Sequence, residues 1–194
     1  MCGKYRLSTE DENIELREII ARIQRDYASA PLRMGDVYPS QLAPALCVIG
    51  GDTRAVPMRG GLTPPVGKRL VINARAETAS TRPMFADALK TRRCVLPAHG
   101  FYEWTKEKTG YYFTPEQGGA LYMAGLYADA PDYPRFVVLT TPALAPCDAV
   151  HERMPLLLTG GELCYAWLHY SALAAAFLSL TACVQLKMDM SSAQ

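Results

Sequence analysis

The sequence lacks the features that mark several large classes of protein. It has six cysteines, but no Cys-x-x-C pair and no cysteine–histidine cluster at the spacing of a zinc site. The formal net charge is only +1, so any contact with nucleic acid must come from a local patch. No stretch reaches the length of apolar sequence that a transmembrane helix needs. We therefore expect no metal, no organic cofactor and no membrane partner.

The amino terminus also lacks the uninterrupted apolar core of a signal peptide. Scattered cysteines without a secretion signal favour free thiols in a reducing compartment, so we expect a cytoplasmic protein. Internal repeats and low-complexity linkers are missing as well. With 194 residues, 49% of them hydrophobic and 20% charged, the chain suits one well-packed globular domain. We expect that domain to span residues 2–194 and to be a monomer.

Local patterns predict a mixture of helices and short strands. Apolar residues at helical spacing predict an amphipathic helix over 8–28, which Thr9 and Glu12 would cap. Proline and glycine then separate short apolar runs, as is typical of short strands and tight loops. Further strands are expected at 94–104, 120–128, 135–143 and 182–188, and further helices within 76–93 and 161–178. Since regular strand–helix alternation is missing, we predict an α+β single domain with a mainly antiparallel, barrel-like β core flanked by helices.

Four polar segments stand out against this apolar background. They are MCG at 1–3, NARAET at 73–78, HGFYEW at 99–104 and HERMP at 151–155. Taken singly, their residues have ordinary interpretations: Asn73 can cap a helix, Glu103 can face solvent by strand alternation, and His151 can pair with its neighbour Glu152. Taken together, a cysteine, an asparagine, a glutamate and a histidine suit nucleophilic chemistry followed by proton transfer.

In this order, the four segments resemble the SOS response-associated peptidase (SRAP) family. The matching residues are Cys2-Gly3, Asn73-Ala74-Arg75-Ala76-Glu77, Arg93-Cys94, Pro97, Gly100-Phe101-Tyr102-Glu103-Trp104 and His151-Glu152-Arg153-Met154-Pro155. The resemblance runs from residue 2 to about 160, with a looser match to the end. The sequence departs from the family pattern in three places: Gly60 stands where a tryptophan is common, Lys4 stands where an arginine is usual, and PALAP follows Thr140-Thr141 where alanine-asparagine is expected.

The resemblance implies a role in the DNA damage (SOS) response, as a sensor of abasic sites in single-stranded DNA. Cys2, exposed by removal of Met1, would attack the ring-opened aldehyde of the abasic sugar, first with its amine and then with its thiol, to give a thiazolidine cross-link. An α-amino group has a pKa of about 7.7–8.0, so a useful fraction is unprotonated near neutrality. Self-processing peptidase and lyase-type activities are implied as well.

The same resemblance assigns roles to individual residues. Cys2, Asn73, Glu103 and His151 would form the catalytic set. Asn73 would position the reacting group, Glu103 would act as acid and base in sugar ring opening and self-processing, and His151 would serve the sugar hydroxyl and reversal of the link. Contacts to DNA are expected from seven residues near this set: Lys4, Pro39, Ser40, Arg59, Arg75, Arg82 and Arg153.

Two other functions fit the same residues. An amidohydrolase or peptidase could use Cys2 as an N-terminal nucleophile with its own amine as the base. A non-catalytic DNA- or protein-binding module would leave Cys2 merely buried. The binding module predicts that a change of Cys2 leaves the activity intact, whereas the other two functions predict its loss. A covalent product with abasic DNA is expected from the cross-linking function and not from the hydrolase.

Overall fold

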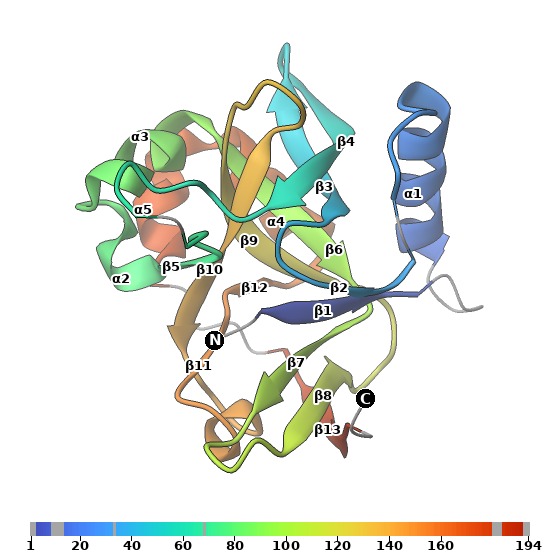
Figure 1. Cartoon of the computed structure of the whole chain (residues 1–194), viewed down its shortest axis with the longest axis vertical. Coiled ribbons are helices and arrows are strands. Elements are labelled where there is room, and N and C mark those ends of the chain that lie inside the picture. Colours follow the sequence, from blue (N-terminus) through green and yellow to red (C-terminus); the bar gives the residue numbers. More distant parts are fainter. Residues whose placement is uncertain (1–2, 9–13, 33, 68, 180–183, 192–194) are drawn as a thin grey trace.

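The computed structural model describes residues 3–8, 14–32, 34–67, 69–179 and 184–191. They form an α+β single domain built on two β-sheets (Figure 1). The strands are β1 (Lys4–Leu7), β2 (Gly35–Val37), β3 (Leu42–Ile49), β4 (Asp52–Gly60), β5 (Asn73–Arg75), β6 (Arg93–Ala98), β7 (Gly100–Trp104), β8 (Gly110–Pro115), β9 (Leu121–Ala128), β10 (Arg135–Pro142), β11 (Arg153–Pro155), β12 (Leu157–Leu158) and β13 (Leu186–Met190). The helices are α1 (Ile14–Asp26), α2 (Ala76–Ala79), α3 (Pro83–Thr91), α4 (Gly160–His169) and α5 (Ala174–Phe177), with 3₁₀ turns η1 (Cys147–Ala149) and η2 (Ser171–Leu173).

The larger sheet closes on itself. Its strand order is β11-β10-β4-β3-β6-β9-β12, and β9 also pairs with β10, which completes a ring. The smaller sheet, β13-β8-β7-β1-β2, is antiparallel throughout. The predicted barrel-like and mainly antiparallel core is therefore confirmed. The exceptions are the parallel pairings of β10 with β4 and β5.

Two apolar clusters form the core. The first joins the two sheets and α1, with Phe101 and Phe113 stacked at 5.1 Å between ring centroids. The second lies beneath α3, α4 and α5 and contains the fully buried Trp167. In Figure 1, α1 stands on one side of the ring and α2, α3 and α5 stand on the other. The helices thus flank the β core as expected.

Arg93, at the start of β6, ties two helix ends to the ring. Its guanidinium donates to the carbonyl oxygens of Leu89 and Lys90, in the last turn of α3, and of Trp167 and Leu168, in the last turn of α4. These carbonyls have no partner within their helices, and a cation suits the negative end of each helix dipole. One buried side chain therefore fixes both helices against the sheet.

The expected strand over 94–104 is wrong in one respect, because the segment is two strands in different sheets. β6 lies in the ring and β7 in the smaller sheet, with the chain turning at His99. The first residue of β7 after this turn is Gly100, where a Cβ would lie 2.5 Å from the carbonyl oxygen of Phe113 on β8. Only glycine lets β7 approach β8 this closely.

The other predicted elements agree in kind but differ in extent. The expected helix over 161–178 is interrupted at Tyr170, which leaves the helical conformation at φ −102° and ψ 86°. The helix expected over 8–28 is described from Ile14 to Asp26, and its predicted cap, Thr9 with Glu12, lies outside the described residues. Among the helices that the structure describes, none is long and apolar enough to cross a membrane.

Candidate active site

Glu103 is a carboxyl buried at the junction of the two sheets. It stands near the end of β7 and is only 1% exposed. Strand alternation does not bring it to solvent, because both faces of β7 are covered. On one face Tyr102 packs against Tyr112 at 4.5 Å between ring centroids, and on the other Phe101 enters the core. The solvent-facing interpretation of Glu103 is therefore wrong.

The surroundings of Glu103 favour its protonated form. Burial raises the pKa of the Glu103 carboxyl, and the positive charge of His151 opposes that rise. A larger fraction of this carboxyl therefore carries a proton near neutrality than in an exposed glutamate. A group of this kind can act as a general acid and, once ionised, as a base.

His151 is half-buried and is fixed by the backbone two residues away. Its Nδ1 lies 3.0 Å from the backbone nitrogen of Arg153 and 3.2 Å from the carbonyl oxygen of the same residue. In the neutral ring, Nδ1 accepts from the Arg153 N–H, which leaves the proton on Nε2. In the charged ring, Nδ1–H can donate to the Arg153 carbonyl. The imidazole thus keeps a backbone partner in both states, as a group that exchanges protons requires.

One groove of about 680 Å³ opens over both residues. Its lining consists of Glu103, Trp104, Thr105, Lys106, Asp148, Val150, His151 and Glu152. Two predicted catalytic residues, which lie in different sheet regions of the fold, therefore share a single opening. Among the described residues, no group of three or more histidine, cysteine, aspartate or glutamate side chains is placed to hold a metal ion.

Asn73 and Arg75 lie on β5, which runs parallel to β10. Asn73 pairs with Val138 and is half-buried, whereas Arg75 pairs with Thr140 and is exposed. The end of β10 also pairs with β11, the strand that follows His151. β10 is therefore the shared neighbour that brings the NARAET and HERMP segments together.

Arg153 has protein partners for its guanidinium. It is 8% exposed and donates to both carboxylate oxygens of Glu77, at 2.5 and 2.9 Å, and to the carbonyl oxygen of Thr140 at 2.5 Å. Arg153 in turn lowers the pKa of Glu77. These bonds join α2, β10 and β11 beside His151. A phosphate contact from Arg153 stays a prediction, and the bonds observed within the protein support a structural role.

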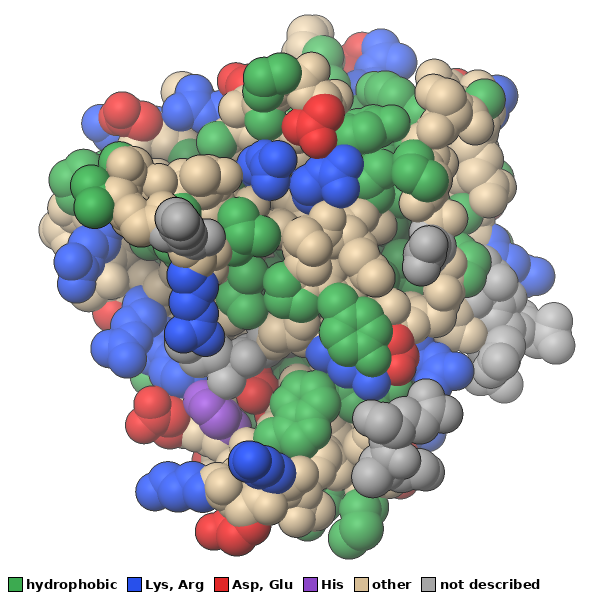
Figure 2. Space-filling model, viewed as in Figure 1, with side chains coloured by type: hydrophobic (Ala, Val, Ile, Leu, Met, Phe, Trp, Pro, Cys, Tyr) green, Lys and Arg blue, Asp and Glu red, His purple; other side chains and the backbone are tan. Residues whose placement is uncertain are grey.

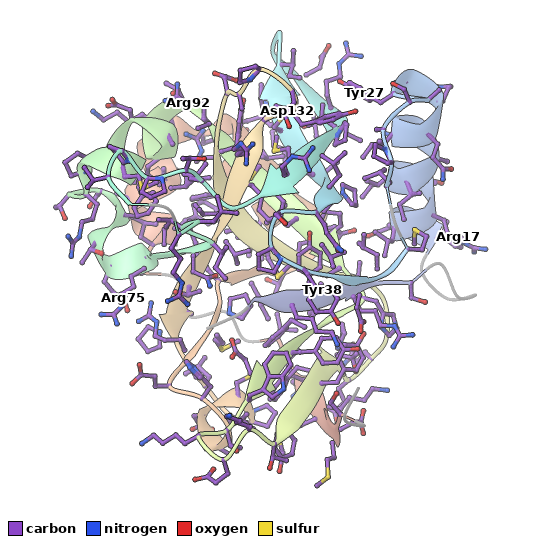
Figure 3. The ribbon with its side chains drawn as sticks, in the orientation of Figure 1. Arg17, Tyr27, Tyr38, Arg75, Arg92 and Asp132 are labelled. Carbon is purple, nitrogen blue, oxygen red and sulfur yellow. The ribbon has the colours of Figure 1, made fainter. Side chains whose placement is uncertain are left out.

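The other predicted DNA contacts differ in their partners. Lys4 forms a 2.8 Å ion pair with Asp36 and lies 4.3 Å from the Tyr102 ring centroid. Arg59 pairs with Asp132 at 3.1 Å. Arg75 and Arg82, which immediately precede α2 and α3, are exposed. Figure 3 shows Arg75 at the edge of the molecule beneath α2, and Figure 2 shows Lys and Arg side chains gathered on that side.

Pro39 and Ser40 form the exposed turn between β2 and β3. Ser40 has a positive φ of 71°, and its N–H donates to the carbonyl oxygen of Gly60 at 2.9 Å. A Cβ on Gly60 would lie 3.4 Å from Phe136, an ordinary van der Waals distance. Crowding therefore does not require glycine at position 60, and a side chain added there would extend beside this turn.

Cys2 lies outside the described residues. The strand that follows it is antiparallel to β7, with Lys4 opposite Tyr102. Continuing this register by one residue places Gly3 opposite Glu103. The described start of the chain therefore runs toward the buried carboxyl.

Sequence reasoning missed the acidic residues that form ion pairs with three of the basic residues predicted to contact DNA. Glu77 was noted only as part of the NARAET segment, and Asp36 and Asp132 were given no role, yet they pair with Arg153, Lys4 and Arg59 respectively. Arg59 and Asp132 are 73 residues apart, and Glu77 and Arg153 are 76 apart. No local pattern signals pairs so distant in the chain.

Comparison with known proteins identifies the family of this chain. The family model for SOS response associated peptidase (SRAP) matches residues 1–192. The abasic site processing protein YoqW of Bacillus subtilis (strain 168) is 31% identical over 179 residues, covering 82% of this chain and 76% of YoqW. The abasic site processing protein YedK of Escherichia coli (strain K12) is 28% identical over 169 residues, covering 82% of this chain and 76% of YedK.

Solved structures show the same fold. A protein from Bordetella bronchiseptica superposes with a TM-score of 0.75 at 21% identity, covering 99% of this chain and 100% of that one. A protein from Bacteroides thetaiotaomicron gives a TM-score of 0.71 at 22% identity, covering 91% and 86% respectively. With the family match over nearly the whole sequence, the conclusion is plain: the chain belongs to the SRAP family, whose relatives named above are abasic site processing proteins.

Proposed function

We propose that this protein binds single-stranded DNA at an abasic site and joins it covalently through Cys2 after Met1 is removed. The observation that carries the proposal is the buried Glu103 carboxyl, which shares a groove with the backbone-fixed imidazole of His151. Opening an abasic sugar is assisted by a general acid, and burial raises the pKa of the Glu103 carboxyl, which favours that role. Family membership supports the choice of an abasic site as the substrate.

The proposed chemistry needs no oxidant or cofactor. Protonated Glu103 assists opening of the cyclic sugar to its aldehyde. The Cys2 amine adds to the aldehyde carbon and water leaves, which gives an imine. The thiol sulfur then adds to the same carbon while the thiol proton passes to nitrogen, and the five-membered thiazolidine closes. Only an N-terminal cysteine carries a thiol and a free amine on adjacent carbons.

The neighbouring residues support these steps. His151 exchanges a proton with the sugar hydroxyl and assists reversal of the link, since both of its protonation states have a backbone partner. Asn73 positions the amine by hydrogen bonding. Arg75 and Arg82, both exposed, are the candidates best placed to contact phosphates.

Further parts of the proposal extend the same chemistry. Glu103 would also assist self-removal of a residue ahead of Cys2, and cleavage of the strand at the abasic sugar would give lyase-type activity. We propose that one domain spanning residues 2–194 does this as a cytoplasmic monomer that acts on DNA under repair.

The test is a cross-linking assay on denaturing gels. With an oligonucleotide carrying one abasic site, the wild type should give a shifted band of protein-plus-DNA size. Cys2→Ala should give none, whereas Cys164→Ala, which removes a buried thiol on α4, should behave as wild type. Intact-mass measurement should show that Met1 is missing. Cross-linking by Cys2→Ala at the wild-type rate, or retention of Met1 in a reactive protein, would contradict the proposal.

A further inference from the structure

Two exposed aromatic rings border the proposed reaction site. Trp104, at the end of β7, is 37% exposed and lines the same groove as Glu103 and His151. Tyr38, directly after β2, is 46% exposed and lines a small apolar pocket together with Gly3. Because the register of β1 against β7 carries Gly3 toward Glu103, both rings lie beside the same centre.

The two rings belong to one continuous surface. The Trp104 ring stacks beside the buried ring of Tyr102, at 6.2 Å between centroids. The Lys4 ammonium lies 4.3 Å from the Tyr102 centroid and 5.2 Å from the Tyr38 centroid. Figure 3 shows Tyr38 at β1, the strand that carries Lys4 and pairs with β7. One ring and one cation therefore connect the two exposed rings.

Contacts within the protein fix both rings. Gly110 lies opposite Trp104 in the register of β7 and β8, and a Cβ there would lie 2.9 Å from the indole Nε1. The indole thus rests on a strand position that has no side chain. The backbone N–H of Tyr38 donates to Oε1 of Gln41 at 3.0 Å, which fixes the turn that carries this ring. A ring that is already ordered loses little conformational entropy when a base stacks on it.

The charges around the rings favour bases over phosphates. The charged residues that line the groove at Trp104 are the acids Glu103, Asp148 and Glu152 and the bases Lys106 and His151. Since the acids outnumber the bases, this groove attracts a phosphate weakly. Beside Tyr38, the charge of Lys4 is paired with Asp36 at 2.8 Å. Aromatic stacking is therefore the main contact that this surface offers to a single strand.

We propose that Trp104 and Tyr38 stack on the two bases at one side of the abasic nucleotide and so hold its sugar at Glu103 and His151. Every base has a π-face, so this contact tolerates any sequence. The two rings position the strand and transfer no proton. The inference rests on the proposed function, since it needs an abasic nucleotide at the neighbouring site.

Binding is measured by fluorescence anisotropy with a tetrahydrofuran analogue of the abasic site, which has no aldehyde and cannot cross-link. Trp104→Leu and Tyr38→Leu should each weaken binding by about tenfold, whereas Trp104→Phe and Tyr38→Phe, which keep a ring, should retain most of the affinity. Because stacking releases no counterions, the factor should be the same at low and at high salt. Tyr165→Leu is the control, since this 51% exposed ring on α4 lines neither opening, and it should bind as wild type.

Tryptophan fluorescence reports directly on one of the rings. The chain has two tryptophans, and Trp167 is fully buried. Quenching by the bound oligonucleotide should therefore come from Trp104 and should disappear in Trp104→Phe.

Spacers without a base link the rings to the bases. They replace the two nucleotides next to the analogue on its 5′ or its 3′ side. On one side the spacers should abolish the effect of both leucine variants, and on the other side the effect should remain. With true abasic DNA, the leucine variants should raise the protein concentration needed for half-maximal cross-linking and leave the rate at saturation unchanged, as expected of positioning residues.

The outcomes separate this inference from the proposed function. Wild-type affinity in Trp104→Leu or in Tyr38→Leu would overturn the stacking role while leaving the covalent function intact. An equal loss of affinity with and without the flanking bases would overturn it as well, since the variants would then act through the fold. Ring-dependent binding to the analogue, without any cross-link to true abasic DNA, would support stacking and refute the covalent function.

Discussion

Replacing Glu103 by glutamine should make the protein more stable and less active at the same time. The structure gives opposite signs to the two effects. Burial raises the pKa of Glu103, so the folded state resists ionisation of this carboxyl, whereas glutamine keeps similar size and shape without a charge. Loss of the transferable proton, in contrast, should lower the cross-linking rate by about 10²–10⁴-fold.

The stability effect depends on pH in a fixed direction. Below the usual glutamate pKa of 4.5, the carboxyl is protonated in both the folded and the unfolded protein and ionisation contributes no penalty. As the pH rises through the higher folded pKa, the wild type loses stability that the glutamine variant keeps. Each pH unit between the two pKa values corresponds to about 1.4 kcal/mol. For a chain of this length, that amounts to a difference of about 3–6 °C in Tm.

The assay is thermal unfolding of wild type and Glu103→Gln at pH 4 and at pH 8, beside cross-linking rates at pH 7. The Tm difference should be near zero at pH 4 and should favour the variant at pH 8. Glu107→Gln, at an exposed position after the same strand, is the control and should shift neither quantity. If the Tm difference between Glu103→Gln and wild type is no larger at pH 8 than at pH 4, the proposed effect of burial is refuted. Unchanged cross-linking would refute the catalytic role.

Three further predictions concern the scaffold and the DNA surface. Arg93→Met should lower the free energy of unfolding in urea by about 3–5 kcal/mol, because four carbonyls at two helix ends lose their donor. The control Arg92→Met should lower it by less than about 1 kcal/mol, and similar losses in the two variants would contradict the assigned role of Arg93. Gly100→Ala should lower stability by about 3 kcal/mol, since its Cβ would meet a carbonyl oxygen at 2.5 Å, and an unchanged Tm would show that the strands can separate freely. Arg75→Ala and Arg82→Ala should each reduce the slope of log affinity against log salt for single-stranded DNA by about 0.7, measured by anisotropy, and an unchanged slope would exclude that arginine from phosphate contact.

The parts of the site visible in the sequence are those encoded in short contiguous stretches. HGFYEW and HERMP identified Glu103 and His151 because each candidate stands among its own family neighbours. Strand and helix types were also predictable, since apolar spacing of two or three to four residues is a local property. The break between β6 and β7 was not, because it shows only in the pairing of β7 with β8, a strand that follows later in the chain.

Charge pairing is the other property that the sequence did not reveal. A list of cations near the motifs treats Arg153, Lys4 and Arg59 as equivalent to Arg75 and Arg82, yet the first three have acidic partners on other elements. Whether a cation faces solvent or another side chain is decided by which strands meet. The sequence therefore supplied the candidates for DNA contact, and the fold ranks the exposed arginines above the paired ones.

The same dependence on tertiary structure applies to the chemistry. Glu103 belongs to the smaller sheet, whereas His151 precedes a strand of the ring, and only the folded chain buries the carboxyl and brings the two residues to one groove. An isolated β7 hairpin would leave this glutamate hydrated with an ordinary pKa. The acid strength of the proposed site is thus a property of the closed fold, and mutations that loosen the junction between the sheets should lower activity even when they touch neither residue.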